Sequence, residues 1–261
     1  MEQLHFTAAA GVATITIHRP LQRNAISQAL WQEFPALCAR IQADTTLRAV
    51  ILRGSGREAF SAGGDISEFA AIRSNRVQAD AYNLHVDAAL TSIRSLSCVT
   101  IALIHGSCMG GGLMLAAACD LRLASSSARF AIPVARLGGL LTHTQLTLFT
   151  ELIGTAHTTN LVLTARTVDA HDALQIGLCS QVVETDALDG MAADLASRIT
   201  AFAPLTQSAH KQLLHAIAAN GGLTSLRALE SELADQVYNS RDYAEGTAAF
   251  VEKRAPHFMG Q

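Results

Sequence analysis

The part of the chain that most constrains the fold reads VTIALIHGSCMGGGLMLAAAC, from Val99 to Cys119. The apolar run from Val99 to Ile104 is typical of a strand that is buried on both faces. A glycine-rich segment from Gly106 to Gly112 follows it, and the alanine-rich segment from Leu113 to Cys119 predicts a helix. The stretch therefore predicts a buried strand, a glycine loop and a helix in direct succession.

A similar junction occurs earlier in the chain. The apolar run from Ala49 to Leu52 is closed by Gly54 and Gly56, and a second glycine loop, SAGGD, spans residues 61–65. Glycine lets a ligand approach the backbone closely, and the start of a helix offers unpaired amide donors to developing negative charge. Either loop alone could be only a tight turn. Together, one after each buried strand, the loops favour a binding site.

Several common enzyme classes lack support in these loops. Neither loop has the spacing G-x-G-x-x-G or G-x-x-x-x-G-K-[ST], nor the lysine or ribose-binding acid that a nucleotide site requires. The sequence also contains no G-x-S-x-G and no H-E-x-x-H. The usual hydrolase and zinc-protease mechanisms are therefore excluded as first interpretations.

The rest of the pattern indicates an α/β fold with a helical end. Strands are expected at residues 4–7, 12–17, 121–124, 128–130 and 181–183, and helices begin at the cap Ser27 and near Ala81. From Asp186 onward the signals are almost entirely helical. We therefore expect an α/β core over residues 1–185 and a helical C-terminal part over residues 186–261.

Composition limits the partners and the compartment. The 261 residues carry 19 Lys and Arg against 22 Asp and Glu, a net charge of −3, which gives no reason to expect nucleic acid as a partner. Charged residues are only 16% of the chain, so we expect identical subunits to cover part of its surface. The five cysteines form no C-x-x-C pair, and no apolar segment is long enough to span a membrane. These features favour a cytoplasmic protein.

Several motifs, in order along nearly the whole chain, resemble the enoyl-CoA hydratase/isomerase family, or crotonase superfamily. The matching segments are Arg19-Pro20 with Asn24-Ala25, Phe60 to Ile66, His105-Gly106 with Met109 to Gly112, Cys119-Asp120, Phe130 with Pro133, Gly138, Leu163 to Arg166, Ala173 to Leu178, and Ala249 to Arg254. The resemblance implies a crotonase-like fold with a ββα spiral core and a helical C-terminal trimerisation region. It also implies a homotrimer or hexamer, and a lyase or isomerase of fatty acid metabolism.

The family's substrates are acyl-CoA thioesters, so the resemblance implies coenzyme A as part of the substrate and no separate cofactor or metal. Two backbone amides form the family's oxyanion hole, and their positions correspond to Gly64 and Gly111. Preorganised amide donors can stabilise the charge that an enolate places on the thioester oxygen. Other positions expected at the substrate, from the same correspondence, are Arg23, Ala25, Ala62, Asp65, Ile66, Met109, Met114, Pro133, Val134 and Lys211. Arg23 and Lys211 resemble basic positions near the CoA nucleotide.

The sequence departs from the family at the two positions that move protons. Hydratases of the family carry one glutamate just beyond the triple glycine and another directly after the proline that matches Pro133. Here those positions are Met114 and Val134, and neither side chain can carry a proton. Hydration by the usual route is therefore not expected, and two alternatives stay open. The chain could be a non-catalytic acyl-CoA binding protein, or it could catalyse isomerisation, dehydration, decarboxylation or thioester hydrolysis with a relocated base.

Histidines are the first candidates for a relocated base. His143 follows Val134 closely and has an imidazole that titrates near neutral pH, so it is the first choice, ahead of His85 and Asp65. His143 could instead merely open a helix, and Asp65 could merely cap one. Arg136 could orient a carboxylate substrate or form a salt bridge. Cys108, without an evident base partner, is expected to be a small buried residue.

Overall fold

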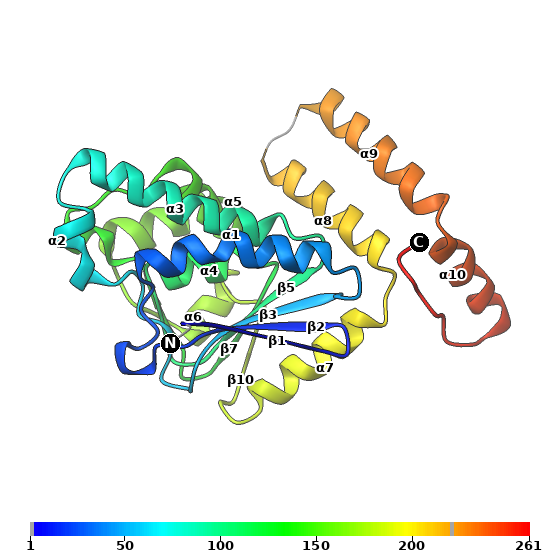
Figure 1. Ribbon diagram of the computed structural model, residues 1–261, viewed down its shortest axis with the longest axis horizontal. Helices are drawn as coiled ribbons and strands as arrows, with labels where there is room; N and C mark the ends of the chain where they lie inside the picture. The colour runs from blue at the N-terminus through cyan, green and yellow to red at the C-terminus, as the bar shows by residue number, and fades with distance from the viewer. Residues whose placement is uncertain (1–2, 220–221) are drawn as a thin grey trace.

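The chain folds around two adjoining sheets (Figure 1). The computed structural model describes residues 3–219 and 222–261. The larger sheet has the strand order β1-β2-β3-β5-β7-β10. Its strands are β1 (Leu4–Ala9), β2 (Val12–Ile17), β3 (Ala49–Gly54), β5 (Val99–Ile104), β7 (Leu121–Ser125) and β10 (Gln181–Val183). β1 and β2 pair antiparallel, and every other neighbouring pair in this sheet is parallel.

The smaller sheet positions the glycine loops. It has the order β4-β6-β8-β9, with β4 (Ala59–Ser61), β6 (Ser107–Met109), β8 (Arg129–Ala131) and β9 (Val168–Asp169). Three of its strands directly follow a strand of the larger sheet and precede a helical segment, so the unit β-β-α recurs along the chain. At one crossing, Gly106 has φ +59° and lies so close to the Glu58 carbonyl that a Cβ would be only 2.0 Å from it. The recurring unit matches the ββα core that the resemblance implies.

Helices cover one face of the larger sheet and enclose the main hydrophobic core. The main ones are α1 (Gln28–Ala43), α3 (Arg76–Arg94), α4 (Gly111–Ala118) and α5 (His143–Thr164), which is interrupted at Gly154. Ser27 caps α1 by accepting a hydrogen bond from the Leu30 amide, as its sequence position predicts. Short segments complete the connections: η1 (Pro20–Gln22), η2 (Ile66–Glu68), α2 (Phe69–Ile72), η3 (Pro133–Leu137) and α6 (Ala170–Gln175).

The start of α3 differs from the sequence expectation. The helix that the sequence predicts to begin near Ala81 begins at Arg76 instead. Asn75 caps this helix, since its side chain accepts a hydrogen bond from the Gln78 amide. Arg76 and Asp80 add an ion pair four residues apart on the exposed face. A capped polar turn therefore precedes the apolar part of the helix, and the apolar pattern alone predicts a later first residue.

The opposite face of the larger sheet is covered by α7 (Leu188–Thr200). A second apolar cluster joins four residues of this helix, among them Leu188 and Ile199, to outward-facing residues of β3, β5 and β7. Helix α7 therefore packs as part of the core, although it lies beyond residue 185. The division of the chain at residues 185 and 186 stays a prediction.

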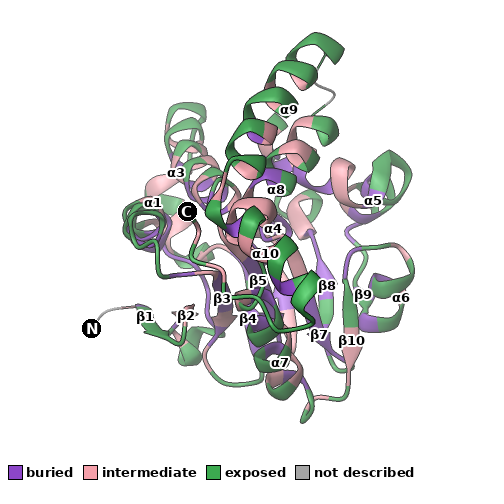
Figure 2. Cartoon of the chain, turned by 90° about the vertical axis from the view of Figure 1, so that its right-hand side faces the viewer, coloured by how far each residue is buried: buried purple, intermediate pink, exposed green. Residues whose placement is uncertain are grey.

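Helices α8 (Pro204–Ala218), α9 (Leu223–Tyr238) and α10 (Arg241–Glu252) extend away from this core (Figure 1). Figure 2 shows most of α9 exposed, and Leu233 is its buried residue. Large apolar side chains on or beside these helices face outward, among them Leu214, Ile217, Leu223, Phe250 and Val251. No helix in the described part of the chain is both long enough and apolar enough to traverse a membrane.

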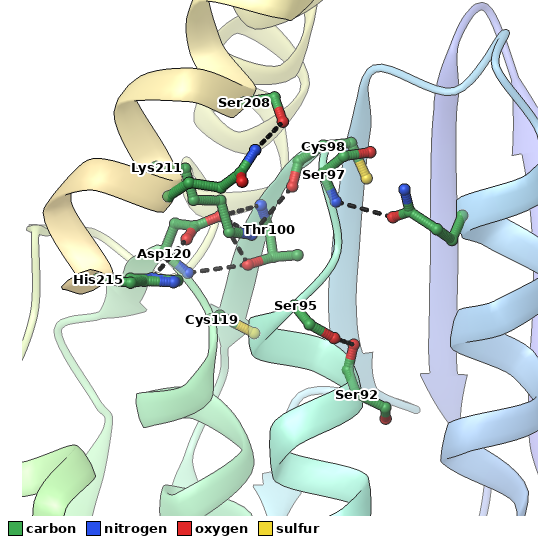
Figure 3. Close-up of polar contacts among 12 residues, drawn as sticks. Ser92, Ser95, Ser97, Cys98, Thr100, Cys119, Asp120, Ser208, Lys211 and His215 are labelled. Carbon is green, nitrogen blue, oxygen red and sulfur yellow. Dashed lines mark hydrogen bonds and ion pairs between the residues drawn. The ribbon is translucent and has the colours of Figure 1, made fainter. Parts of the chain in front are cut away.

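A nearly buried ion pair attaches α8 to the core (Figure 3). The Lys211 ammonium, only 8% exposed, donates to the Asp120 carboxylate at 2.8 Å and to the Cys98 carbonyl at 3.1 Å. Asp120 also accepts hydrogen bonds from the amide and the hydroxyl of Thr100, at 2.7 and 2.9 Å. A buried charge is tolerated only when it is paired and hydrogen-bonded, and this network satisfies both groups. It fixes the direction in which the C-terminal helices leave the core.

Candidate active site

The two glycine loops meet because the strands before them are neighbours. β4 and β6 pair in the smaller sheet, so the loops that follow them lie side by side. The contact is between backbones: a Cβ on Gly63 would lie 2.9 Å from the Met109 carbonyl oxygen and 3.5 Å from the Gly111 amide nitrogen. Side chains would hold the loops apart. The glycine pattern in the sequence therefore reflects a real close approach.

The amides of Gly64 and Gly111 are left available by the backbone around them. Ile26 donates to the Gly63 carbonyl at 2.8 Å and accepts from the Asp65 amide at 2.9 Å, so the amide of Gly64, between them, points away from Ile26. Gly111 is the first residue of α4, where an amide has no acceptor within the helix. A Cβ on Gly111 would be 3.4 Å from the Gly64 nitrogen. Two unengaged donors therefore lie close together.

Both glycines line a cavity of about 100 Å³. Its other walls are mostly apolar and include Met114, Ile132, Val134, Leu137 and Leu141. Of the positions expected at the substrate, the cavity brings together Ala62, Gly64, Ile66, Gly111, Met114, Pro133 and Val134. Met114 and Val134, which stand at the two expected carboxylate positions, thus face the space beside the amides without offering a proton.

Some expected residues lie behind or beside the loops rather than in the cavity wall. Arg23 is exposed, and its carbonyl accepts a hydrogen bond from the Ala62 amide at 2.9 Å. The Ala25 carbonyl accepts from Arg19, and the Met109 carbonyl touches Gly63, so both support loop backbone. Arg23, Ala25 and Met109 therefore lie next to the cavity but do not line it.

Asp65 is committed to ordering the first loop. Its carboxylate pairs with Arg19 at 2.9 Å and accepts hydrogen bonds from the amide and the hydroxyl of Ser67, capping η2. The Ser67 hydroxyl, and after it Arg19, lower the pKa of Asp65. A carboxylate held ionised by these partners is a poor proton donor and a weak base. The capping alternative therefore describes Asp65 better than a catalytic one.

The histidine candidates do not line the cavity. His143 is exposed at the first position of α5, where Thr142 and Gln145 form a capping box. Gln145 faces the cavity. His143 lies two residues before Gln145 and therefore on a different face of the helix, so it points away from the cavity. His85 contacts Gln32 at 3.0 Å instead of the cavity. The geometry thus gives no support to either histidine as the relocated base.

Three further candidate residues also lie away from the cavity. Lys211 is occupied by Asp120 and lines a separate groove of about 450 Å³ between α8 and the core (Figure 3). Arg136 donates to the Ala165 carbonyl at 2.9 Å rather than forming the expected salt bridge. Cys108 is fully buried, which raises the pKa of its thiol well above the ordinary value and suits a core residue.

Sequence reasoning missed the polar floor of the cavity. The indole of Trp31 donates to the hydroxyl of Tyr82 at 2.9 Å, and both residues line the cavity. A Cβ on Gly64 would lie 2.9 Å from the Tyr82 oxygen, and a Cβ on Gly111 would lie 2.8 Å from the Trp31 ring. Burial raises the pKa of Tyr82, so the phenol keeps its proton at neutral pH. Trp31 lies on the buried apolar face of α1, and periodicity alone indicates only a core residue there.

Arg73 is the other missed residue, and no sequence pattern marks it. It follows α2 in the stretch before the expected helix, and its guanidinium carbon lies 5.2 Å from the centre of the Phe69 ring and 5.3 Å from that of Tyr82. Among the residues lining the cavity, Tyr82 and Arg73 are the ionisable side chains. Over residues 3–219 and 222–261, no group of three or more His, Cys, Asp or Glu side chains is placed to hold a metal.

Known proteins share both this sequence pattern and this fold. The sequence model described as enoyl-CoA hydratase/isomerase matches residues 7–261. The short-chain-enoyl-CoA hydratase of Clostridium acetobutylicum is 32% identical over 243 residues, covering 93% of this chain and 92% of that protein. The carnitinyl-CoA dehydratase of Citrobacter koseri is 33% identical over 263 residues, covering 100% and 99%. A crystal structure of an enoyl-CoA hydratase/carnithine racemase from Magnetospirillum magneticum has a TM-score of 0.96 at 35% identity, covering 100% of this chain and 97% of that one.

Proposed function

The chain belongs to the enoyl-CoA hydratase/isomerase family, and from this premise we propose that it is an acyl-CoA enzyme without the glutamate pair. The amides of Gly64 and Gly111 hold the thioester oxygen, and the Tyr82 hydroxyl transfers the proton. Coenzyme A enters as part of the substrate, and no separate cofactor takes part. The reaction is a lyase step in which a C–C bond of the acyl group breaks with loss of CO₂. The electron pair of that bond forms the thioester enolate, so no base has to remove a proton. The Tyr82 phenol then protonates the α-carbon of the enolate and regains a proton from water.

The observation that carries this proposal is the pair of unengaged amides at one end of a small apolar cavity. An enolate concentrates charge on one oxygen, and fixed donors stabilise that charge without having to reorganise. The apolar walls, Met114 and Val134 among them, lower the local dielectric and strengthen the interaction. Arg23, exposed beside Ala62, is placed to meet the phosphates of coenzyme A outside the cavity.

Proton transfer falls to Tyr82 because the usual groups are missing. Met114 and Val134 occupy the two expected carboxylate positions, and the other ionisable side chain of the cavity wall, Arg73, has no acceptor for a proton. Trp31 donates to the Tyr82 oxygen, so the proton of the phenol is free to point into the cavity. Its position beside Gly64 brings that proton near the enolate. A protonated phenol suits the step in which the enolate is quenched.

We also propose that copies of the chain associate as a trimer or hexamer through the C-terminal helices. Isolated helices with apolar faces are poorly stable in water, and burial against another copy removes that apolar area from solvent. Phe250 and Val251, on α10, are 85% and 79% exposed. Their exposure in a single copy supports an interface at this end of the molecule.

The amide proposal is tested by comparing Gly111→Pro with Gly111→Ala. Both variants add a Cβ near Trp31, but only proline removes the N–H donor. Loss of one oxyanion-hole donor lowers kcat by about 10² to 10³. We expect acetyl-CoA affinity, measured by calorimetry, and turnover to fall further in Gly111→Pro than in Gly111→Ala. Equal behaviour of two folded variants would contradict the role of the amide.

The loss of the glutamates predicts poor hydration of crotonyl-CoA. Each general acid or base typically contributes about 10² to 10⁴-fold, and Met114 and Val134 contribute neither. We expect the wild type to hydrate crotonyl-CoA slowly and the double variant Met114→Glu, Val134→Glu to be at least about 10²-fold faster. Hydration is measured through the absorbance of the enoyl thioester. Rapid hydration by the wild type would contradict this prediction.

The Tyr82 proposal predicts a loss of kcat with little change in KM for Tyr82→Phe. With a substrate found by screening acyl-CoA thioesters, we expect kcat to fall by about 10² or more. Burial raises the pKa of the Tyr82 phenol; the cation of Arg73 opposes this shift, and the carboxylates of Asp65 and Glu68 add to it. The wild-type activity should therefore show no loss from phenol ionisation between pH 6 and about 9. Tyr243→Phe, at an exposed tyrosine of α10, is the control. An unchanged kcat in folded Tyr82→Phe would remove Tyr82 from the mechanism.

Assembly is tested by sedimentation velocity at micromolar concentration. We expect the wild type to sediment as a trimer or hexamer and Phe250→Asp to shift toward monomer, since the substitution places a charge in the apolar contact. Leu84→Asp, at an exposed leucine of α3, is the control and should leave the assembly unchanged. A monomeric wild type would contradict the proposal.

A further inference from the structure

Arg73 is a cation that neither the amides nor the proton transfer uses. Its guanidinium lies against the Phe69 and Tyr82 rings, at 5.2 and 5.3 Å from their centres. The rings attract the cation electrostatically, and the guanidinium N–H groups donate to no other side chain or carbonyl among the described residues. The side chain is therefore held in position with its donors available.

No carboxylate of the described residues pairs with Arg73. The nearby acids have other partners. Asp65 binds Arg19 and Ser67, Glu68 accepts a hydrogen bond from the Gln28 amide at 2.8 Å, and Asp80 pairs with Arg76 at 2.6 Å. The cavity wall contains no acidic side chain at all among those residues. A half-buried positive charge in an otherwise apolar cavity favours a ligand that brings the missing negative charge.

The position of Arg73 relates it to the acyl group. A Cβ on Gly139 would lie 3.7 Å from an Arg73 nitrogen and 3.2 Å from a methyl carbon of Val134, so Arg73 reaches the Val134 side of the cavity. Arg73 also lines an adjoining pocket of about 470 Å³, which shares Phe69, Asn83, Leu137 and Leu141 with the cavity. An acyl chain too long for the cavity can therefore extend past Arg73.

We propose that Arg73 selects acyl groups whose far end carries a carboxylate, so that the preferred substrates are monothioesters of dicarboxylic acids with coenzyme A. The planar guanidinium matches a carboxylate with two parallel hydrogen bonds, which gives both affinity and orientation. This inference rests on the proposed function, because it assumes that the thioester oxygen is held by Gly64 and Gly111. An alternative source of the negative charge is a phosphate of coenzyme A itself.

Calorimetric titration with matched pairs of ligands separates these possibilities. Succinyl-, glutaryl- and adipyl-CoA are compared with butanoyl-, pentanoyl- and hexanoyl-CoA, which have equal chain lengths and no terminal charge, and acetyl-CoA reports on the CoA portion alone. The variants are Arg73→Gln, Arg73→Lys and the control Arg198→Gln, which alters an exposed arginine of α7 on the opposite face of the larger sheet.

We expect the wild type to bind at least one dicarboxylic thioester about 10-fold or more tighter than its uncharged partner. Arg73→Gln should abolish this preference and leave acetyl-CoA affinity unchanged. Arg73→Lys should keep part of the preference, and Arg198→Gln should keep all of it. A wild type without the preference overturns the inference alone. Equal weakening of acetyl-CoA and dicarboxylic thioesters in Arg73→Gln also overturns it and assigns Arg73 to a phosphate. Failure of every thioester to bind the wild type overturns the proposed function as well.

Discussion

Two loops of the chain touch backbone to backbone, and the site exists only where they do. β4 and β6 deliver the loops to the same edge of the smaller sheet, and the Gly63 backbone then packs on the Met109 carbonyl without an intervening side chain. The bridge between Ile26 and Gly64 holds the first loop from behind. Because backbone geometry is stiff, this arrangement fixes the two amide donors in advance, which is the condition for stabilising a developing charge.

The surroundings of the amides determine what they can do. Trp31 and Tyr82 form the floor beneath Gly64 and Gly111, and their mutual hydrogen bond satisfies the indole N–H while leaving the phenolic proton available. Apolar side chains, those of Met114 and Val134, occupy the two positions where the resemblance implies glutamates. The cavity thus combines two unengaged backbone amides with one phenol and one cation held against aromatic rings. That combination differs chemically from a pair of carboxylates, which can both remove and deliver a proton.

The C-terminal helices differ in how they are attached to the core. α7 returns to the larger sheet and closes its second face, whereas α8 is attached through Lys211 and Asp120 and directs α9 and α10 away. A charge pair of this kind is specific in geometry, because both groups need their partners when they leave water. The exposed apolar residues beyond it therefore occupy a defined place relative to the core.

Local features of the sequence were sufficient for much of this structure. Strand, turn and cap preferences act within a few residues. The strands and loops were therefore predicted by the apolar runs at residues 49–52 and 99–104 and by the glycine loops after them. The resemblance assigned Gly64 and Gly111. The sequence also showed that Met114 and Val134 cannot transfer protons. Only the tertiary structure placed Tyr82 against Trp31, Arg73 against Phe69, and Lys211 against Asp120, and it turned His143 away from the cavity. Periodicity indicates which side of a helix is buried, but the group that each side chain meets lies far away in the chain and is decided by packing.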